Sequence, residues 1–368
     1  MACFHYFSFC RVGGIALCCL QPRNNSCPVP SNWPESFRGA TFYIPWIRET
    51  QSFIKIARGL FDGVYSNFCL LGYWLTLLIR RKNEKDLNFK FFNIDISNSD
   101  LLSNLFADLN PNIVINLAAQ AGVRYSIENP ISYVESNLIG TFHILEMARK
   151  YKPDHLLMAS TSSVYGSNKD VPLHETQKCD TQMSFYAATK KSNEAMAHSY
   201  SHLYDIPTTM FRFFTVYGPW GRPDMALFKF TKNILSGKSI EIYNSGNMVR
   251  DFTYIDDLVN AIFLLTSKIP PKANKRRGVL KNDSISDVAP FRIVNIGNSQ
   301  PINLLDYVRE LEYVLGKVAK KKFLGMQDGD IHKTHSNINL LKALTGFEPK
   351  TNMREGITRF VKWYRSYY

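Results

Sequence analysis

The stretch S-T-S-S-V-Y-G at residues 160–166, followed after a polar loop by S-F-Y-A-A-T-K at residues 184–190, decides the fold of this chain. The hydroxyl cluster comes directly after the largely apolar run at residues 155–159. Such an arrangement is typical of the end of a buried parallel strand, and open α/β sheets bind their ligands at that edge. We therefore expect the chemistry of this protein at the carboxyl end of this strand.

Strands and helices alternate from about residue 87 onward. The sequence predicts a strand at 89–95, a helix at 100–109, a buried strand at 112–119 and, after a polar loop at 269–290, a strand at 291–296. This alternation predicts an α/β fold built on a Rossmann-like, doubly wound parallel sheet.

Tyr186 and Lys190 are four residues apart, a spacing that places the phenol and the ammonium on one face of a helix. The cation can stabilise a phenolate and lower the pKa of the tyrosine from ~10 toward neutral pH, so the pair can act as a general base. Taken alone, such a pair is more often part of a solvated helix face. The hydroxyl-rich strand end before it and the helical pattern after it favour the catalytic interpretation.

With these motifs the chain resembles the extended short-chain dehydrogenase/reductase family and, within it, the sugar-nucleotide epimerases. Thr161, Tyr186 and Lys190 match the catalytic triad of that family. The resemblance covers roughly residues 88–368 and implies NAD as the cofactor, a UDP-sugar as the substrate and a homodimer formed through two helices. It also implies a smaller substrate domain in the C-terminal part of the chain.

The resemblance also implies which residues bind NAD. Asp95, followed by Ile96, matches a pair whose Asp binds the adenine amino group, and a helix cap or turn is the alternative for this Asp. Asn137 matches an Asn that supports the active-site helix and the cofactor, with a buried structural amide as its alternative. The remaining cofactor positions are the segment Leu117, Ala118 and Ala119, the aromatic Phe214, and Tyr186 and Lys190 themselves.

The segment F-R-F-F-T-V-Y-G-P-W-G-R-P-D-M at 211–225 resembles the epimerases that act on UDP-glucuronate more than those that act on UDP-galactose. Arg222 offers a bidentate partner for the C6 carboxylate and Thr215 adds a hydroxyl, whereas a surface loop arginine is the alternative for Arg222. Arg124 and Arg250 are the other expected substrate contacts, Arg250 at the diphosphate.

Two serines argue against a dehydratase. Sugar-nucleotide dehydratases of this family carry an Asp-Glu pair directly after the catalytic Thr, because eliminating water needs an added acid and base. This chain has Ser162 and Ser163 there, and we expect both near the substrate. Serines that merely cap the strand are the alternative.

Residues 1–88 do not show the expected start of a dinucleotide-binding domain. A short strand, G-x-x-G-x-x-G and a helix belong there, because glycine lets the backbone approach the pyrophosphate. The glycines of this segment lack that spacing. We hypothesise that it is a frame-shifted or mis-assembled stand-in for the first βαβ unit. The alternative is a degenerate family member that binds NAD poorly or not at all.

The chain is therefore expected to have three parts. Residues 1–88 form the atypical N-terminal segment, and residues 89–217 form the rest of the NAD-binding Rossmann domain. Residues 218–368 form mainly the substrate domain, interleaved with the last Rossmann elements.

The composition of the 368 residues is that of a globular protein, with a net charge of +13. The basic runs are scattered and lack an aromatic-interleaved stripe, so attraction to an anionic nucleotide is favoured over nucleic-acid binding. Five of the seven cysteines fall in the first 27 residues without paired C-x-x-C spacing, which indicates neither a disulfide framework nor a metal site.

Membrane insertion is also not expected. The apolar run at 64–79 has sixteen residues, whereas ~20 are needed to span a bilayer. The N-terminus lacks a convincing signal cleavage site, although a signal peptide stays possible. We expect a cytoplasmic protein.

Together these features predict NAD-dependent inversion of C4 of UDP-glucuronate to give UDP-galacturonate through a 4-keto sugar. Tyr186 is the expected base, Thr161 a proton relay, and Lys190 the residue that lowers the tyrosine pKa and holds the nicotinamide ribose. An epimerase acting on another UDP-sugar and an inactive family member are the alternatives.

Overall fold

The computed structural model describes residue 92 and residues 94–272, 280, 282–327 and 329–368. The first 88 residues, with the missing fingerprint and the frame-shift hypothesis, lie outside this part. The α-helices are α3 (Ser99–Leu109), α4 (Tyr125–Glu128), α5 (Ile131–Tyr133), α6 (Gly140–Tyr151), α7 (Phe185–Tyr204), α8 (Ala226–Leu235), α9 (Ile255–Thr266), α10 (Leu304–Leu315), α11 (Asn339–Thr345) and α12 (Met353–Tyr367).

The strands are β1 (Ile113–Asn116), β2 (His155–Thr161), β3 (Thr208–Phe213), β4 (Thr215–Tyr217), β5 (Ser239–Ile242), β6 (Val249–Tyr254), β7 (Phe291–Ile296), β8 (Pro301–Asn303) and β9 (Lys320–Phe323). Three further helical segments are not α-helices: η4 (Val134–Ile139), and the 3₁₀-helices η5 (Ser162–Tyr165) and η6 (Tyr243–Gly246). Of these, η4 is π-helical.

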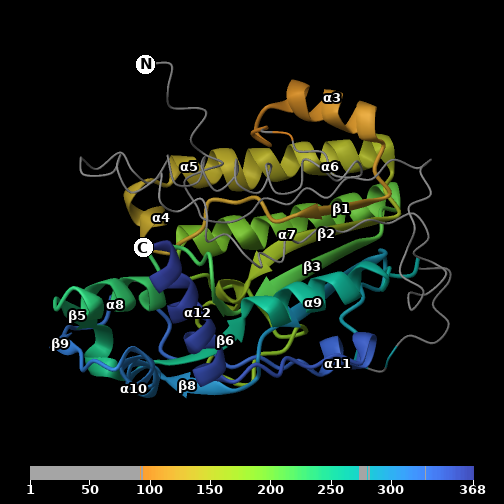
Figure 1. Cartoon of the computed structure of the whole chain (residues 1–368). Coiled ribbons are helices and arrows are strands. Elements are labelled where there is room, and N and C mark those ends of the chain that lie inside the picture. Colours follow the sequence, from red (N-terminus) through yellow and green to blue (C-terminus); the bar gives the residue numbers. More distant parts are fainter. Residues whose placement is uncertain (1–91, 93, 273–279, 281, 328) are drawn as a thin grey trace, which may run out of the picture.

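The central sheet has four parallel strands in the order β1-β2-β3-β7. Successive residues of a strand point to opposite faces. Val114 and Leu156 pack with α3, α6 and α7, whereas the next residues, Ile115 and Leu157, pack with α9 and α11. Helices therefore cover both faces of the sheet, as Figure 1 shows, and the predicted α/β fold with a doubly wound parallel sheet is confirmed.

The predicted helix at 100–109 is α3, whose start is set by a capping side chain. The Asn98 carboxamide oxygen accepts a hydrogen bond from the backbone N–H of Leu101. Leu102, Leu105 and Phe106 recur at helical spacing and are buried. The helix thus packs its apolar side onto α6.

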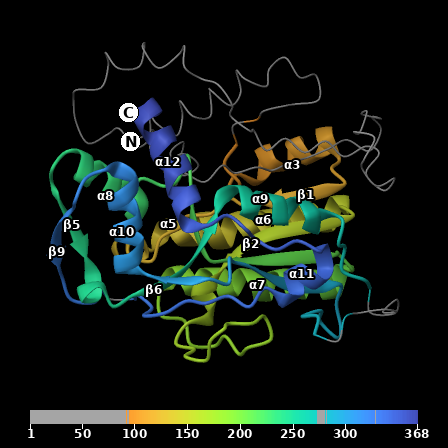
Figure 2. The same cartoon turned by 60° about the horizontal axis from the view of Figure 1, so that its bottom comes forward.

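A second hydrophobic cluster lies beside the central sheet. It is rich in aromatic residues and joins β4, β6, α8, α10 and α12. Figure 2 shows α8, α10, β5 and β9 gathered at one end of the molecule. The chain returns from this cluster to the central sheet through α9 and β7. A substrate domain beginning at residue 218 and interleaved with the last Rossmann elements agrees with this packing and stays a prediction.

Two predicted strands differ in extent from the structure. The strand at 89–95 lies mostly outside the described residues, and Phe92, Ile94 and Asp95 are in no strand. The strand at 112–119 ends at Asn116, because the Asn116 side chain accepts a hydrogen bond from the N–H of Ala118 and turns the chain. The residues described between α9 and β7 form no helix or strand, while residues 273–279 and 281 of the predicted loop at 269–290 lie outside the described part.

Within the described residues, no helix combines the length and the apolar character needed to cross a membrane. The apolar run at 64–79 lies outside this part of the chain.

Candidate active site

The three residues expected to be catalytic lie where β2 ends and α7 begins. Thr161 is the last residue of β2, and its hydroxyl accepts a hydrogen bond from the N–H of Ser163 at 3.2 Å. Tyr186 is the second residue of α7, which Ser184 caps. The Thr161 hydroxyl acts on the ionisation of the Tyr186 phenol, so the two side chains lie close to each other. The structure therefore places the two hydroxyls together, as the sequence predicted.

The pKa of Tyr186 is raised, because burial outweighs the opposing effects of the Thr161 hydroxyl and of the positive charge of Arg222. The sequence predicts the opposite direction, with Lys190 lowering the pKa of this phenol. Arg222 is the cation that acts on Tyr186 within the described part of the chain. This corrects the expectation, since helical spacing alone took no account of burial.

Lys190 follows Tyr186 by one helical turn. It is buried, with 3% of the residue's surface exposed. Burial lowers the pKa of its ammonium to about 8, and the nearby carboxylate of Glu194 opposes this shift. Within the described residues, no hydrogen bond or ion pair engages the ammonium. A buried ammonium, with its three N–H donors, fits the hydroxyls of a nucleotide ribose.

Asn137 connects the loop after β1 to the catalytic helix. Its side chain accepts a hydrogen bond from the Gln120 N–H at 2.8 Å and donates to the Gln120 carbonyl and the Thr189 hydroxyl, each at 3.0 Å. Thr189 lies on α7, and Asn137 lies in the π-helical turn η4. Irregular π-helical turns occur frequently at functional sites. The segment Leu117 to Ala119 directly precedes Gln120, so this clamp fixes the predicted cofactor loop.

The other predicted cofactor residues lie in ordered local structure. The Asp95 carboxylate accepts hydrogen bonds from the N–H and the hydroxyl of Ser97, both at 2.8 Å, which is the turn alternative for this Asp. The Ile96 carbonyl lies 3.1 Å from Nδ1 of His143. Phe214 is buried after β3. Whether these residues bind adenine or nicotinamide stays a prediction.

Arg222 and Thr215 line the same small pocket, together with aromatic residues of the second cluster. Nε and Nη2 of Arg222 form a bidentate ion pair with Asp224, at 3.0 and 2.5 Å. A Cβ atom on Gly122 would lie only 3.0 Å from Nη2 of Arg222, and the φ of Gly122 is +117°. Glycine is therefore required where the loop after β1 meets this arginine.

The loop at 218–225, which carries Arg222, is anchored by contacts between aromatic rings. Trp220 has a φ of +63°, which is unfavourable for a bulky residue. Its ring packs against Trp363 and Tyr367 of α12, with centroid distances of 5.1 and 5.0 Å. The last turns of α12 therefore hold this loop in its strained conformation.

Arg124 and Arg250 come from distant segments and share Asp330 as a neighbour. Arg124 lies 3.5 Å from the Asp330 carboxylate and stacks on the ring of Tyr243. Arg250 donates to the carbonyls of Val249 and His332, and burial lowers its pKa, opposed by the charge of Asp330. The structure thus brings the two expected substrate arginines to one side chain.

Ser162 and Ser163 begin η5 directly after Thr161 and are partly buried. The Thr161 hydroxyl lies 3.3 Å from the Ser163 hydroxyl. Of the two positions that carry acids in dehydratases, the second therefore presents a hydroxyl to the predicted catalytic Thr.

Sequence reasoning missed three residues of this site: Tyr133, Asp224 and Asp330. Tyr133 is fully buried, donates to the Gly122 carbonyl at 2.6 Å, and packs its ring edge to face on Tyr186. Its position four residues before Asn137 was an available signal for a shared helix face. Asp224 lies within the segment 211–225 that carries the family resemblance, and Gly329-Asp330 resembles the C-terminal pattern of the same family. Neither position predicted its arginine partner, because loop geometry defines the contact.

The chain is similar in sequence to proteins of one family. The sequence model of the NAD dependent epimerase/dehydratase family matches residues 69–276. The chain is 50% identical over 281 residues to Protein CapI of Staphylococcus aureus, covering 76% of this chain and 84% of that protein. It is 46% identical over 282 residues to UDP-glucuronate 4-epimerase 4 of Arabidopsis thaliana, covering 74% and 62%.

The fold of this chain is also similar to that of a solved structure. The UDP-glucuronic acid 4-epimerase from Bacillus cereus, crystallised with UDP-glucuronic acid and NAD, superposes with a TM-score of 0.68. The two sequences are 32% identical, and the match covers 78% of this chain and 85% of that one.

Proposed function

The chain belongs to the NAD dependent epimerase/dehydratase family, and from this membership we propose that it catalyses NAD-dependent C4 epimerisation of UDP-glucuronate to UDP-galacturonate. The observation that carries the proposal is the grouping of Tyr186, Thr161 and Arg222. The phenol lies close to the Thr161 hydroxyl and to the positive charge of Arg222, and a guanidinium is well suited to pair with a carboxylate. This combination provides a base, a relay and a uronate anchor in one site.

In this proposal Tyr186 removes the proton of the sugar 4-hydroxyl. Thr161 either forms a hydrogen bond with the same sugar oxygen or relays the proton to Tyr186. NAD, when bound, would accept the hydride from C4 and return it to the opposite face of the 4-keto sugar, and its ring would add positive charge, with Lys190 and the segment Leu117 to Ala119 among the residues that would hold it. Tyr186 then returns the proton. Lys190 donates hydrogen bonds to the nicotinamide ribose.

The raised pKa of Tyr186 shapes this chemistry. A phenol with a raised pKa is protonated at neutral pH, so its deprotonation needs nearby positive charge. Arg222 already acts in this direction. An enzyme that ionises Tyr186 only in the assembled complex keeps its base inactive until substrate and cofactor are both in place.

Selectivity for a uronate is proposed to come from Arg222 and Thr215, which line one pocket. Arg124 and Arg250 are proposed to bind the nucleotide part, where their charges meet the diphosphate. Ser162 and Ser163 provide no acid and base pair for elimination of water. The proposed outcome is therefore inversion at C4 rather than dehydration.

The sequence also favours a second candidate, a family member that binds NAD weakly or not at all, because residues 1–88 lack the glycine fingerprint. The deciding experiment incubates the purified full chain with UDP-glucuronate, with and without added NAD, and follows UDP-galacturonate by NMR. Formation of product supports the first candidate. No product and no NAD retained after incubation support the second.

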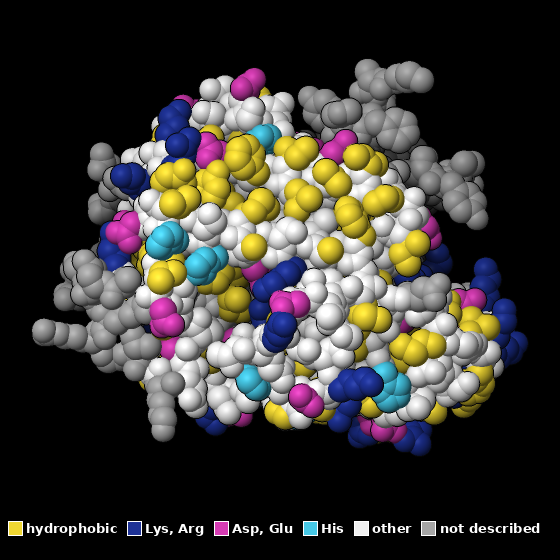
Figure 3. All heavy atoms as spheres, turned by 180° about the vertical axis from the view of Figure 1, so that it is seen from behind, with side chains coloured by type: hydrophobic (Ala, Val, Ile, Leu, Met, Phe, Trp, Pro, Cys, Tyr) yellow, Lys and Arg dark blue, Asp and Glu magenta, His cyan; other side chains and the backbone are white. Residues whose placement is uncertain are grey.

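We also propose a homodimer. Figure 3 shows hydrophobic side chains in a broad band at the height where Figure 1 places α5, α6 and α7. Exposed apolar residues on these elements include Ile131, Phe142 and Leu203, the last 64% exposed. Apolar patches of this kind mark interaction surfaces, and a two-helix contact between copies suits α6 and α7. Location in the cytoplasm stays a prediction.

A further inference from the structure

A buried ion pair lies directly behind the proposed catalytic residues. Nε and Nη2 of Arg212 on β3 each donate to the carboxylate of Glu194 on α7, at 2.9 Å. The Ser160 hydroxyl on β2 donates to the same carboxylate at 2.7 Å. Arg212, Glu194 and Ser160 are each at most 3% exposed. Three elements that form the site are thus joined through one carboxylate.

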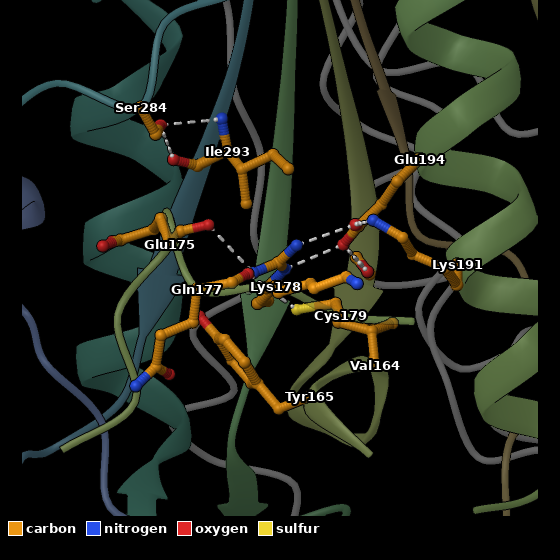
Figure 4. A network of polar contacts seen from close by, with 12 residues as sticks. Val164, Tyr165, Glu175, Gln177, Lys178, Cys179, Lys191, Glu194, Ser284 and Ile293 are labelled. Carbon is orange, nitrogen blue, oxygen red and sulfur yellow. Dashed lines mark hydrogen bonds and ion pairs between the residues drawn. The ribbon is translucent and has the colours of Figure 1, made fainter. Parts of the chain in front are cut away.

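Arg212 and Glu194 make further contacts within this network. Arg212 donates to the Glu175 carbonyl at 3.2 Å, and its guanidinium lies 4.6 Å from the centre of the Tyr165 ring. Lys191 adds a second cation 3.3 Å from Glu194. Figure 4 shows Glu194 and Lys191 on one side of the network and Tyr165 and Glu175 on the other. The carboxylate is therefore held in a single orientation.

Two members of this network, Ser160 and Glu194, lie close in the chain to proposed catalytic residues. Ser160 immediately precedes Thr161, and it is paired with Arg212 in the β2 and β3 register. Glu194 follows Lys190 by four residues, so the two side chains share a face of α7. The network therefore fixes the height and rotation of α7 relative to the end of β2.

Stability alone does not explain such a pair. Moving two charges from water into a protein interior costs about as much as their attraction returns, and well-packed apolar residues often replace a buried pair without loss. A buried charge that also faces a functional ammonium has a second effect. Its field acts on that ammonium with little screening, because the surroundings have a low dielectric constant.

We propose that Glu194, held by Arg212 and Ser160, is a positioning residue that keeps the Lys190 ammonium charged and aligned beside Tyr186 and Thr161. The proposal rests on the proposed function, because it takes Lys190 as the group that holds the nicotinamide ribose. It goes beyond that function by assigning a role to a pair that contacts neither substrate nor cofactor.

The charges near Lys190 define what the carboxylate does. Titratable groups in the first half of α7 are Tyr186, Lys191 and Glu194, and the elements packed on α7 carry Tyr133 on α5, Tyr165 in η5 and Arg212 on β3. Glu194 is the one among them whose charge acts on Lys190, and it raises the pKa that burial lowers to about 8. Removing this charge therefore lowers the pKa of Lys190 further, and the ammonium loses its proton at a lower pH.

The test compares Glu194→Gln with the double variant Glu194→Leu/Arg212→Met, which leaves no unpaired buried charge. Two quantities are measured between pH 6 and 9 on the full chain: the pH profile of kcat and the affinity for NADH by fluorescence titration. We expect the alkaline limb of kcat to move to lower pH in both variants. One unit of pKa corresponds to about a tenfold loss at a pH above it, and NADH affinity should weaken over the same range.

The Arg292 and Asp283 pair provides a matched control. It is similarly buried and bidentate, with both distances at 2.8 Å, but it involves the start of β7 at the opposite end of the sheet. We expect Asp283→Leu/Arg292→Met to change the melting temperature alone. Wild-type pH profiles and NADH affinities in both Glu194 variants would overturn the proposal. If the wild-type chain makes no UDP-galacturonate, the proposed function fails, while the NADH titration still decides the role of Glu194.

Discussion

At the scale of single residues, Tyr186 is controlled by opposing influences. Burial raises the pKa of its phenol, whereas Thr161 and Arg222 act to lower it. Tyr133 holds the ring from the side. The chemistry of the site is therefore set by side chains from several elements that meet at one hydroxyl group.

Replacing Tyr186 with Phe removes the proposed base and retains the ring packing on Tyr133. We expect kcat for UDP-glucuronate to fall about 10²- to 10⁴-fold, the range for loss of a general base. Binding of UDP-glucuronate, measured by calorimetry, should stay within a few-fold. Tyr204→Phe at the far end of α7 is the control and should retain full activity. A Tyr186→Phe variant with wild-type kcat would rule out this base.

Arg222 is expected to discriminate between a uronate and a hexose. Arg222→Ala should weaken UDP-glucuronate binding by about 30- to 100-fold, in line with loss of a hydrogen-bonded charge pair, and leave UDP-glucose binding nearly unchanged. The double variant Arg222→Ala/Asp224→Ala tests whether Asp224, once it has lost its arginine partner, repels the carboxylate of UDP-glucuronate. Equal losses for both ligands would show that Arg222 supports the pocket without reading the carboxylate.

At the scale of elements, the sequence predicts the helices and strands that are defined by residues close together in the chain. The alternating strands, the capped helix α3 and the Tyr186 to Lys190 spacing follow from periodicity and capping residues. Contacts that depend on distant loops were not predictable in this way. Trp363 and Tyr367 carried no signal for their contact with Trp220, because the strained turn that brings Trp220 to α12 is defined only by the folded chain.

His155 links β2 to α9 and provides a pH test at this scale. Its ring nitrogens bond to the Thr266 carbonyl and the Thr209 hydroxyl, and burial lowers its pKa to about 4 from the usual 6.5. The folded state therefore favours neutral His155, whereas the unfolded state binds a proton below pH 6.5. This contribution to stability is complete above pH 6.5 and is lost as the pH falls toward 4.

Urea unfolding at pH 7 and pH 5 measures this effect. We expect His155→Gln to lose about 2 kcal/mol less stability than the wild type on going from pH 7 to pH 5, because a pKa unit corresponds to ~1.4 kcal/mol. The exposed His174→Gln serves as the control and should follow the wild type. Identical losses in all three proteins would show that His155 does not titrate in this range.

At the scale of the whole molecule, the chain alternates between the central sheet, whose two faces carry separate hydrophobic clusters, and an aromatic-rich cluster beside it that joins β4, β6 and the helices α8, α10 and α12. Arg222 lines a small pocket with Thr215 and aromatic residues of this second cluster. Thr161 and Tyr186 lie at the end of β2 and the start of α7. The proposed active site therefore depends on the packing of the second cluster beside the central sheet.

The proposed dimer is tested by charging its apolar surface. We expect the wild-type chain to have twice the monomer mass in size-exclusion chromatography with light scattering, and Phe142→Asp/Leu203→Asp to have the monomer mass. Burial of two charges in an apolar contact strongly disfavours association. Val318 is 85% exposed and lies away from α6 and α7, so Val318→Asp should leave the mass unchanged. A wild-type monomer would contradict the proposal.

The position of β7 in the central sheet has a consequence for how the protein is made on the ribosome. β3 ends at Phe213, yet its neighbour β7 begins only at Phe291. At the usual speed of translation of 5–20 residues per second, the edge of β3 waits roughly 4–16 s for its partner. During that interval it presents unpaired N–H and C=O groups to other chains. Production in cells should therefore benefit from slower initiation or a lower temperature, which leave fewer nascent chains with this edge exposed at once.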